Sequence, residues 1–492
     1  MRKLTVLAAF PLLALLLAMS PQPVMSSTAS TAAVSSTASA AAREGTAVFN
    51  TPRPFSKTYE GNFAIVSQVD RAINGVPRHA RKSRKPQPVI HITTYLMDHS
   101  RSVSSLIEAC KRGVAVRVII DQDIDNKNSR RLISTLNGDN VTDRNHDGKP
   151  DRKAKRGPCN RPLKRDRVAR PSIESGGESG GESVDGGLMS REQAARSVDA
   201  PLTDSVTWGK DGSYVKRCTP SCRSGKGNMH MKIYLFSQTR KAHDVVMVSS
   251  SNINRGGAKL GWNDMYVMRG RPESYAEYVK QHLAMTFGKP APRQGVFFED
   301  GPYTSRFFPI KDAGMKKDPV MHDLAKIRCR GSAWGATKIN ISMFYWKGKR
   351  GNYIADKLLR MARDGCQISI IYGAPSRQIA ERLRVAARNN LIDLYDSRWD
   401  FNEDGWNEVR THSKFVLVRG SYEGNNKKWV VMTGSPNWVA GSLSKGDEST
   451  LNIELKSAYD AYLANWVKMR EHSRKLPYPA TTTEPTFRPA TS

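Results

Sequence analysis

The sequence predicts an α/β fold of two similar halves, each a mostly parallel sheet flanked by helices, packed together with pseudo-twofold symmetry. Strand and helix patterns alternate, and the same order of elements occurs twice along the chain. Strands that alternate with helices are typical of parallel sheets, because a crossover helix returns the chain to the same edge. The length of 492 residues is enough for two such halves.

The elements of the first half follow one another closely. Val89 to Leu96 is rich in β-branched residues and predicts a strand. Val103 to Arg112 has the apolar spacing of a helix, and Gly113 ends it. Val114 to Ile120 then predicts a second, buried strand. This strand–helix–strand order defines the unit that is repeated.

The second half repeats the unit. Lys338 to Tyr345 predicts a strand, and a helix follows through Ile354 to Arg363. Asp364 and Gly365 end that helix, and Gln367 to Tyr372 predicts the next strand. We therefore predict a first half at residues 43–290 and a second half at residues 291–476.

Three further segments carry no repeat. Residues 1–42 predict a signal peptide and small-residue leader, and residues 477–492, rich in Pro and Thr, predict a disordered tail. The first half contains an insertion at about residues 126–214, basic at first and then of low complexity. We predict this insertion to be a mobile excursion.

The beginning of the chain predicts the compartment. Two basic residues precede an apolar run at residues 4–19, and small residues follow as far as Ala40. This order is typical of a secretory signal. A transmembrane anchor is the alternative, but the run is short and Pro11 interrupts it. We predict a secreted, extracellular protein.

Charge and cysteine content agree with an exported protein that meets polyanions. Lys and Arg number 77 against 46 Asp and Glu, a formal net charge of +31. Such a charge favours nucleic acid, anionic lipid surfaces or acidic cell-wall polymers as partners. An even number of cysteines in an exported chain favours disulfides over zinc, with Cys218 and Cys222 able to close a small loop. The six cysteines are Cys110, Cys159, Cys218, Cys222, Cys329 and Cys366.

Two motifs of the form His-x-Lys stand at matching places in the halves. Each opens an apolar strand, and residues two apart in a strand face the same way, so an imidazole lies beside an ammonium group. Each is followed by a second apolar strand that ends in Ser-x-Asn. One His-x-Lys is common by chance, but the doubled arrangement predicts one shared site. Its residues are His230, Lys232, Asn252, His412, Lys414 and Asn437.

The doubled pattern resembles the phospholipase D superfamily of two-motif phosphodiesterases, of the secreted bacterial type. The resemblance runs from about Val48 to Leu476, apart from the insertion. It implies two phospholipase D-like halves that bring His230 and His412 together at a shared seam. Because these histidines lie 182 residues apart in the chain, only packing of the halves can do so.

The sequence departs from the family pattern in two respects. The family has an Asp after the Lys, with four residues between them, and Ser237 and Arg419 stand at those positions. Ser249 replaces the first of two family glycines, while Gly434 keeps the second. The missing Asp is mostly a structural support in the family, so its loss does not remove the reactive groups.

The resemblance implies covalent catalysis. One imidazole attacks phosphorus and forms a phosphohistidine while the other protonates the leaving oxygen, and water then attacks with the second histidine as base. By analogy with the family, His230 is the nucleophile and His412 the acid. The lysines and asparagines hold the non-bridging oxygens. The lysines supply the positive charge, so we expect no catalytic metal and no other cofactor.

Each catalytic histidine needs a partner that fixes its tautomer. Members of the family place an acidic residue shortly after the Asn turn. Asp264 fits this position in the first half, and Glu448 fits it in the second, with Asp447 as the rival. A solvated surface carboxylate is the alternative for each.

Two further loops share the order D-x-N-x-D-G. Such loops gather hard oxygen ligands around a glycine turn, as calcium loops do. Neither has Glu at the twelfth position, so a full EF-hand is not expected; a plain polar turn is the favoured interpretation, and a structural calcium ion is the alternative. The candidate ligands are Asp143, Asn145, Asp147, Asp151, Asp400, Asn402, Asp404 and Glu408.

We predict a phospholipid at a membrane surface as the substrate, cleaved at its head-group phosphodiester bond. Several aromatic residues near the motifs are candidates to line an apolar entrance or to insert at a lipid interface. Burial in the core is the alternative for them. They are Phe344, Tyr345, Trp346, Trp399, Phe401, Trp406 and Trp438.

Two other functions remain open from the sequence. A secreted, metal-independent nuclease of the same superfamily would use the positive charge, including a basic stretch at residues 152–170, to bind DNA or RNA. A catalytically decayed polyanion-binding protein would explain the missing Asp at Ser237 and Arg419. We predict no protein partner and expect a monomer.

Overall fold

A computed structural model describes residues 45–80, 83–121, 125–137, 212–218 and 220–477. All of the described residues belong to one compact unit, and residues 1–42 lie outside the described part. The predicted leader, most of the predicted insertion and nearly all of the predicted tail also lie outside it. Among the described residues, no helix is long and apolar enough to cross a membrane.

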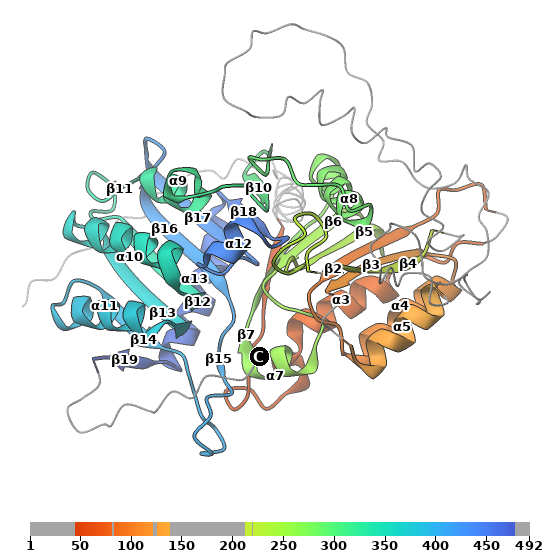
Figure 1. Cartoon of the computed structure of the whole chain (residues 1–492), viewed down its shortest axis with the longest axis horizontal. Helices are drawn as coiled ribbons and strands as arrows, with labels where there is room; N and C mark the ends of the chain where they lie inside the picture. Colours follow the sequence, from red (N-terminus) through yellow and green to blue (C-terminus); the bar gives the residue numbers. More distant parts are fainter. Residues whose placement is uncertain (1–44, 81–82, 122–124, 138–211, 219, 478–492) are drawn as a thin grey trace, which may run out of the picture. The chain divides into compact units, whose positions relative to one another are not determined.

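The first half contains a seven-stranded sheet in the order β1-β8-β6-β5-β2-β3-β4 (Figure 1). Its strands are β1 Thr46–Phe49, β2 Val89–Thr94, β3 Ala115–Asp121, β4 Tyr214–Cys218, β5 Ile233–Thr239, β6 Ala242–Ser249 and β8 Asp264–Met268. The helices of this half are α2 Tyr59–Asn62, α3 Ala64–Asn74, α4 Ser100–Lys111, α5 Lys127–Asn137, α7 Arg255–Leu260 and α8 Pro272–Thr286.

The second half contains a ten-stranded sheet in the order β19-β14-β13-β12-β16-β17-β18-β10-β9, with β11 paired to β16. Its strands are β9 Val296–Asp300, β10 Tyr303–Phe307, β11 Ile327–Arg328, β12 Lys338–Trp346, β13 Gln367–Pro375, β14 Asp393–Asp396, β16 Lys414–Tyr422, β17 Asn425–Gly434, β18 Ser449–Ile453 and β19 Arg474–Leu476. Its helices are η2 Met315–Lys317, α9 Pro319–Ala325, α10 Gly348–Arg363, α11 Arg377–Arg388, α12 Ala440–Ser444 and α13 Lys456–Glu471.

The structure confirms the α/β class and the two halves, but strand pairing is mixed rather than mostly parallel. Parallel pairs join only β2, β3 and β4 in the first sheet and β12, β13 and β14 in the second. Helices connect β2 to β3 and β12 to β13, as the repeat predicts. The strands that follow the His motifs are joined by tight turns, β5 to β6 and β16 to β17, and a tight turn forces antiparallel pairing.

The predicted helix ends are confirmed at two glycines. Gly113 follows α4 with a φ of +89°, and a Cβ there would lie 2.3 Å from the carbonyl oxygen of His79. Gly365 follows α10 with a φ of +101°. The turn after each helix needs a left-handed backbone at this position. Glycine adopts that conformation without strain, so the turn requires glycine at both positions. The predicted insertion begins later than expected, because α5 occupies residues 127–137.

Three large hydrophobic cores and a small fourth cluster of Phe308, Ile310 and Leu443 stabilise the described chain. One lies between the first sheet and α3, α4 and α5, and another lies between the second sheet and α9, α10 and α11. The central core holds side chains from both sheets together with α8 and α13, among them Leu235, Leu417 and Tyr462. The faces of the two sheets that meet in this core join the halves.

A short parallel pair crosses the seam between the halves. β7 (Gly261–Trp262) pairs with β15 (Arg410–Thr411) in register. A Cβ at Gly261 would lie 2.7 Å from the carbonyl oxygen of Gly257 and 3.5 Å from the Cβ of His412. The backbone of the first half therefore requires glycine here, and the β7–β15 pair places the second His motif directly against the first half.

Two disulfides are present among the described residues, in agreement with the predicted use of the cysteines. Cys218 and Cys222 close the small loop that the sequence predicted, and Cys329 and Cys366 join the segment before β12 to the start of β13. Cys159 lies outside the described residues.

Two histidines are buried in the first half, where the sheet meets α8. Thr93 bonds Nδ1 of His282 at 2.9 Å, and Arg117 lies 3.3 Å from Nε2 of His91. Burial lowers the pKa of His282 to about 3 and holds the pKa of His91 well below its usual value. Both rings are therefore neutral in the folded protein at neutral pH.

These histidines predict a loss of stability in acid. In the unfolded chain these histidines bind protons below about pH 6.5, but in the folded protein they stay neutral until a much lower pH. The free energy of unfolding therefore decreases as the pH falls below about 6.5. We expect His282→Gln to reduce this loss by about 1.4 kcal/mol for each pH unit below 6.5. Urea unfolding at pH 7 and pH 5 measures it, and an unchanged pH dependence in the variant would contradict the account.

Candidate active site

The two His-x-Lys motifs approach the seam from opposite sides, and each is held by the other half. The backbone N–H of His230 donates to the carbonyl oxygen of Asp447 at 3.0 Å. The N–H of His412 donates to the carbonyl oxygen of Trp262 at 2.9 Å. His230 and His412 are near enough to affect each other's protonation. The predicted catalytic pair is therefore brought together by this reciprocal exchange of backbone hydrogen bonds.

The imidazole rings also take their partners from the opposite half. Nδ1 of His230 lies 2.9 Å from Oε2 of Glu448, a carboxylate whose side chain is buried. Nδ1 of His412 lies 2.9 Å from Oδ1 of Asn263, a neutral amide. In both rings Nδ1 carries the proton when it donates to these oxygens, which leaves Nε2 free to react.

Different partners place the two rings in different electrostatic environments. Burial acts to raise the pKa of Glu448, but the positive charges of His230 and Lys232 outweigh it and hold the pKa to about 2. Burial lowers the pKa of His230, and the Glu448 carboxylate partly offsets this effect. The pKa of His412 lies well below its usual value because burial and nearby cations act together without such an offset.

Asp264 does not contact either histidine, which corrects its predicted role. Its carboxylate accepts hydrogen bonds from Ser250 Oγ at 2.8 Å, from Tyr462 OH at 3.1 Å and from Thr433. Asp264 begins β8, so its side chain points to the opposite face from that of its neighbour Asn263. Asp264 thus joins the two halves inside the protein, while Asn263 contacts the catalytic ring.

A comparison of the two halves would have identified Asn263. Ser250 and Ser435 make the same contacts, because each N–H donates at 3.0 Å to the carbonyl oxygen of a residue fourteen positions later, Asp264 or Ser449. Asn263 and Glu448 each come one residue before that position, so they are equivalent. The search for acidic residues missed Asn263 because an amide fills the position.

Both motif lysines are buried beside their histidines. The ammonium group of Lys232 donates to the carbonyl oxygen of His230, and that of Lys414 donates to the carbonyl oxygen of His412. The side chains of Lys232 and Lys414 form no salt bridge with a carboxylate of the described chain. Burial lowers the pKa of Lys232 to about 7 and that of Lys414 well below its usual range. A bound anion would relieve this cost, so the pair is a candidate anion site.

The predicted asparagines complete the same site. Oδ1 of Asn252 and Oδ1 of Asn437 are buried, and neither has a hydrogen-bond partner in the described part of the chain. Buried amide groups are normally paired, so unsatisfied ones mark a place where a ligand is expected. The predicted role of these two asparagines as phosphate ligands stays a prediction.

An aromatic ring flanks each of the two motifs; Phe344 was a sequence candidate for the apolar entrance, whereas Tyr95 was not predicted. The Tyr95 ring centre lies 5.5 Å from that of His230 and 5.6 Å from Nζ of Lys232. The Phe344 ring stands in the same relation to the second motif, 4.9 Å from the His412 ring and 5.0 Å from Nζ of Lys414. Each half therefore contributes one aromatic wall, from Tyr95 just after β2 and from Phe344 near the end of β12.

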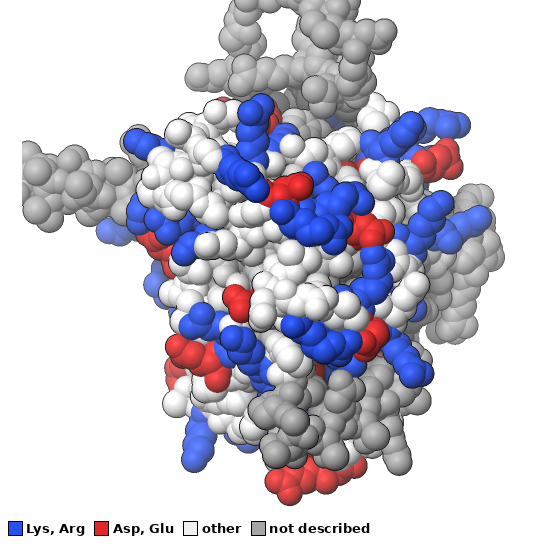
Figure 2. Space-filling model, turned by 90° about the vertical axis from the view of Figure 1, so that its left-hand side faces the viewer, with Lys and Arg blue, Asp and Glu red and all other residues white. Residues whose placement is uncertain are grey.

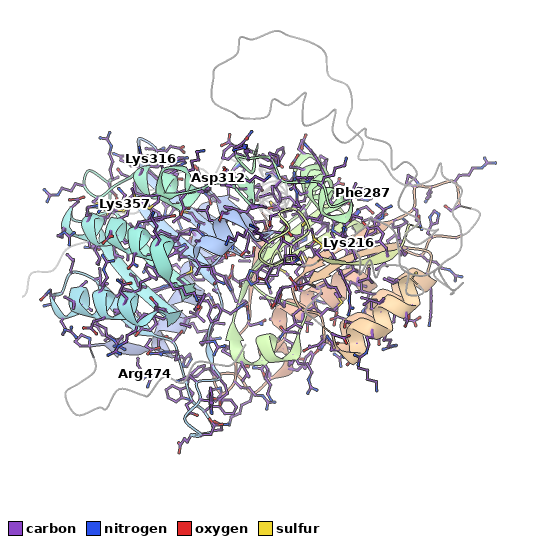
Figure 3. All side chains as sticks on the ribbon, viewed as in Figure 1. Lys216, Phe287, Asp312, Lys316, Lys357 and Arg474 are labelled. Atoms are coloured by element: carbon purple, nitrogen blue, oxygen red, sulfur yellow. A yellow bond between two sulfur atoms is a disulfide. The ribbon has the colours of Figure 1, made fainter. Side chains whose placement is uncertain are left out.

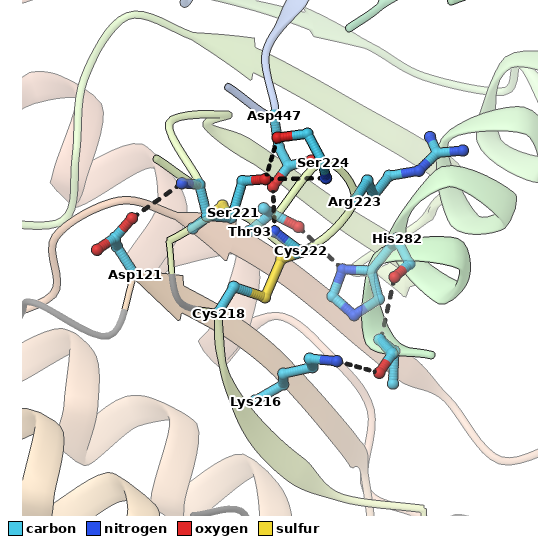
Figure 4. Close-up of a disulfide and its surroundings, with 12 residues drawn as sticks. Thr93, Asp121, Lys216, Cys218, Ser221, Cys222, Arg223, Ser224, His282 and Asp447 are labelled. Carbon is cyan, nitrogen blue, oxygen red and sulfur yellow. Dashed lines mark hydrogen bonds between the residues drawn. A yellow bond between two sulfur atoms is a disulfide. The ribbon is translucent and has the colours of Figure 1, made fainter. Parts of the chain in front are cut away.

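The Cys218–Cys222 disulfide lies beside Asp447 (Figure 4). The N–H of Cys222 donates to Oδ2 of Asp447 at 2.6 Å, and Oδ2 of Asp121 accepts from the N–H of Met229 at 2.8 Å. Burial raises the pKa of Asp447 to about 7. Asp447, the rival of Glu448 in the sequence, thus fixes the disulfide loop and the His230 backbone rather than an imidazole.

The positions of the missing family Asp lie away from the reacting groups. Ser237 accepts a hydrogen bond from the N–H of Val89 at 2.9 Å, and Arg419 stacks on the Trp334 ring at 4.8 Å. Both side chains therefore have contacts of their own within their sheets. At the family glycines, a Cβ on Gly434 would lie 2.2 Å from the carbonyl oxygen of Ser449, whereas Ser249 is accommodated and donates to the carbonyl oxygen of Asp264.

Half of the predicted calcium ligands can be placed. One ligand oxygen from each of Asp400, Asp404 and Glu408 lies within 4.8 Å of the others. Asn402 donates to Asp404 at 3.0 Å, so its amide belongs to the same turn. The calcium site here stays a prediction. The other loop, with Asp143, Asn145, Asp147 and Asp151, lies outside the described residues.

Comparison with known proteins gives one family and several distant structures. The family model of the cardiolipin synthase PLD-like domain matches residues 84–285 and 332–469. Among curated protein sequences, none matches the chain.

The similar solved structures share little sequence with the chain. They include polyphosphate kinase from Porphyromonas gingivalis (12% identity, 92% of this chain and 51% of that chain, TM-score 0.46) and phosphatidylserine synthase from Haemophilus influenzae (11%, 85% and 86%, 0.45). A third is Nuc from Salmonella typhimurium, a phospholipase D family member (15%, 35% and 96%, 0.26). The chain spans about half the length of the polyphosphate kinase. These likenesses are too distant to assign a substrate.

The two matched segments cover well over half of the chain, one in each half, and each contains one His-x-Lys motif. The two segments matched by the family model thus correspond to the two halves of the repeat, which meet at the seam. The chain belongs to the cardiolipin synthase PLD-like family of the phospholipase D superfamily, whose members act on phosphodiesters.

Proposed function

We propose that this protein is a secreted, monomeric phosphodiesterase that hydrolyses the head-group phosphodiester bond of phospholipids through a phosphohistidine intermediate. The observation that carries the proposal is the pair of buried lysines, Lys232 and Lys414, beside two histidines with free Nε2 atoms. A phosphodiester is a monoanion that would lie between these lysines, within reach of both rings. Its non-bridging oxygens would also pair with the unsatisfied amides of Asn252 and Asn437.

His230 is the better nucleophile of the pair. Glu448 accepts the Nδ1 proton, which fixes the Nε2 lone pair toward the substrate and stabilises positive charge as the N–P bond forms. Asn263 orients the His412 ring but carries no negative charge to stabilise its imidazolium form. Protonated His412 is therefore a stronger acid than protonated His230. A bound phosphodiester anion raises the pKa of His412 and allows it to hold the proton that it donates.

The reaction then has two balanced steps. Nε2 of His230 attacks phosphorus and the bond from phosphorus to the head-group oxygen breaks, while His412 gives its proton to the leaving oxygen and the alcohol departs. Water next attacks the phosphohistidine, and neutral His412 takes the proton from the water. The N–P bond breaks, phosphatidic acid leaves, and His230 returns to its starting state. The lysines stabilise the charge on the equatorial oxygens in both steps.

A nuclease of the same superfamily is the second candidate, and the charge of +31 favours it. Figure 2 shows one face of the molecule, where Lys and Arg are numerous but acidic side chains lie among them. Some of the basic side chains on α10 and α11 are paired, as Arg388 is with Glu381 and Arg382 with Asp356. Basic side chains on this face are therefore partly neutralised.

The two substrates can be separated in one assay. We expect the protein to release the head group from phosphatidylcholine vesicles in the presence of EDTA, because the lysines supply the positive charge. A His230→Ala/His412→Ala variant should release none. Cleavage of plasmid DNA with the same controls, without lipid hydrolysis, would overturn the lipid assignment. Failure to cleave either substrate would favour a decayed polyanion-binding protein.

Asn263→Asp should move the pH profile of the reaction. A carboxylate in place of the amide favours the charged form of His412, so its pKa rises. Because His412 must be protonated in the first step, the limb of kcat that falls with increasing pH should move upward by about one pH unit. Asn263→Ala should instead lower kcat without that shift. An unmoved profile in Asn263→Asp would show that Asn263 does not act on the catalytic acid.

A further inference from the structure

A protruding loop carries most of the exposed aromatic surface near the seam. Trp399, Phe401 and Trp406 are 39%, 40% and 36% exposed, and they lie within eight residues of one another. They belong to the connection from β14 to β15, which Figure 1 shows projecting from the body beside β15. We call residues 399–406 the aromatic loop. Two of the other aromatic residues considered from the sequence, Trp346 and Trp438, are buried in the core instead.

The aromatic loop is held in shape rather than left loose. Trp399 and Val409 pair through two backbone hydrogen bonds of 2.9 and 3.1 Å, which close the loop at its base. Within it, Oδ2 of Asp400 accepts from the N–H of Gly405 at 2.7 Å, and Oδ1 of Asp404 accepts from the N–H of Trp406 at 2.9 Å. The three aromatic side chains are therefore presented to solvent by a fixed turn, at little entropic cost to a partner.

A chain of aromatic contacts connects this loop to the site. The Phe55 ring lies 5.7 Å from the Trp399 ring, 5.7 Å from the Trp262 ring and 4.4 Å from the His472 ring. Trp262 in turn accepts backbone hydrogen bonds from His412 and Ser413 at 2.9 Å. A surface that binds the aromatic loop is thus held close to the catalytic seam.

The charge of the loop selects the partner. Asp400, Glu403, Asp404 and Glu408 lie in or beside it, so a polyanion such as DNA is repelled there. The interfacial region of a zwitterionic bilayer suits the same surface, because exposed Trp and Phe rings insert among the head groups and the carboxylates meet choline or ethanolamine cations.

We infer that the aromatic loop docks the protein on a zwitterionic phospholipid surface and holds the catalytic seam against it. The inference deepens the proposed function and rests on it for the substrate, because it names the surface from which the lipid is drawn. It also places Phe401 and Trp406 at the tip of the loop, where they meet the bilayer first.

Vesicle binding tests the inference in the full chain. Phe401→Ala/Trp406→Ala leaves the contact of Trp399 with Phe55 in place, and we combine it with His230→Ala so that lipid is not consumed. We expect binding to phosphatidylcholine vesicles to weaken at least about tenfold, as measured by sedimentation. The matched control is Phe287→Ala/Phe297→Ala, which removes two aromatic rings of similar exposure, 36% and 38%, from the end of α8 (Phe287, Figure 3) and from β9 (Phe297). Equal binding by both double variants would overturn the inference.

A second measurement separates docking from chemistry. In the presence of active-site histidines, the loop variant should lower the ratio of hydrolysis of vesicles to hydrolysis of monomeric dibutyryl phosphatidylcholine at least about tenfold. A ratio equal to that of the Phe287→Ala/Phe297→Ala control would overturn docking while leaving the proposed function intact. Vesicle binding that depends on the loop, in a protein that hydrolyses neither lipid, supports docking and overturns the proposed function. Loss of DNA binding with unchanged vesicle binding would also overturn the inference.

Discussion

Replacement of His230 by Ala is expected to reduce phosphodiester hydrolysis by at least about 10³-fold, because it removes the atom that bonds to phosphorus. The side chain contacts Glu448 and lies beside Tyr95 in a preformed site, so Ala leaves most of the surrounding contacts in place. KM should change far less than kcat, since the lysines and asparagines still bind the phosphate. Steady-state kinetics on phosphatidylcholine in mixed micelles measure both quantities.

The control for this variant is a histidine from the same half. His243 lies exposed on β6, and His243→Ala should retain wild-type kcat and KM. A comparable loss in both variants would mean that the assay reports protein integrity rather than chemistry. Full activity in His230→Ala would exclude His230 as the nucleophile.

Replacement of Lys232 or Lys414 by Met should lower the activity of the protein without lowering its thermal stability. Each lysine supplies charge to the equatorial oxygens in the transition state, so kcat/KM should fall by about 10²- to 10³-fold for each. In the free protein the same ammonium groups are buried without a salt bridge to the described carboxylates, and burial lowers the pKa of both. Met fills a similar volume without a charge, so thermal stability should be unchanged or higher.

This opposite effect on two properties distinguishes a binding site from a structural one. The thermal midpoint is measured by calorimetry in the absence of phosphate, and kcat/KM is measured on the same preparations. Lys347→Met serves as the matched control, since Lys347 is exposed and stacks on Tyr345 at 5.1 Å. A fall in both activity and thermal midpoint for the motif variants would show that the lysines hold the fold rather than the substrate.

Much of the fold is readable from the sequence because the repeat is encoded locally. The strand–helix–strand units at residues 89–120 and 338–372 combine β-branched runs, helical spacing and terminal glycines, and the structure confirms each element within a few residues. Strand pairing is harder to predict from the sequence. The directions of β6 and β17 are set by the short turns that precede them and not by the composition of the strands. The alternation rule therefore overestimated the parallel part of both sheets.

The site was predictable where residue type alone carries the chemistry. The histidines, lysines and asparagines stand out because imidazole, ammonium and amide groups recur at matched spacing. The partner of His412 did not stand out, because Asn263 and Asp264 are neighbours and only the direction of β8 decides which of them faces the ring. The equivalent positions of Tyr95 and Phe344 could not be predicted from the sequence either. An aromatic residue near a motif is as often buried in the core as it is part of a site.

Trapping the covalent intermediate tests the account most directly. His412→Asn removes the base that hydrolyses the phosphohistidine, while a p-nitrophenyl phosphatidyl diester needs no acid to leave, so the phosphatidyl group should remain on the protein. Mass spectrometry after trypsin should find that mass on the peptide Gly227–Lys232, which contains His230. The added mass should be absent from His230→Ala/His412→Asn. Release of p-nitrophenol without any such adduct, or an adduct on a different residue, would contradict nucleophilic catalysis by His230.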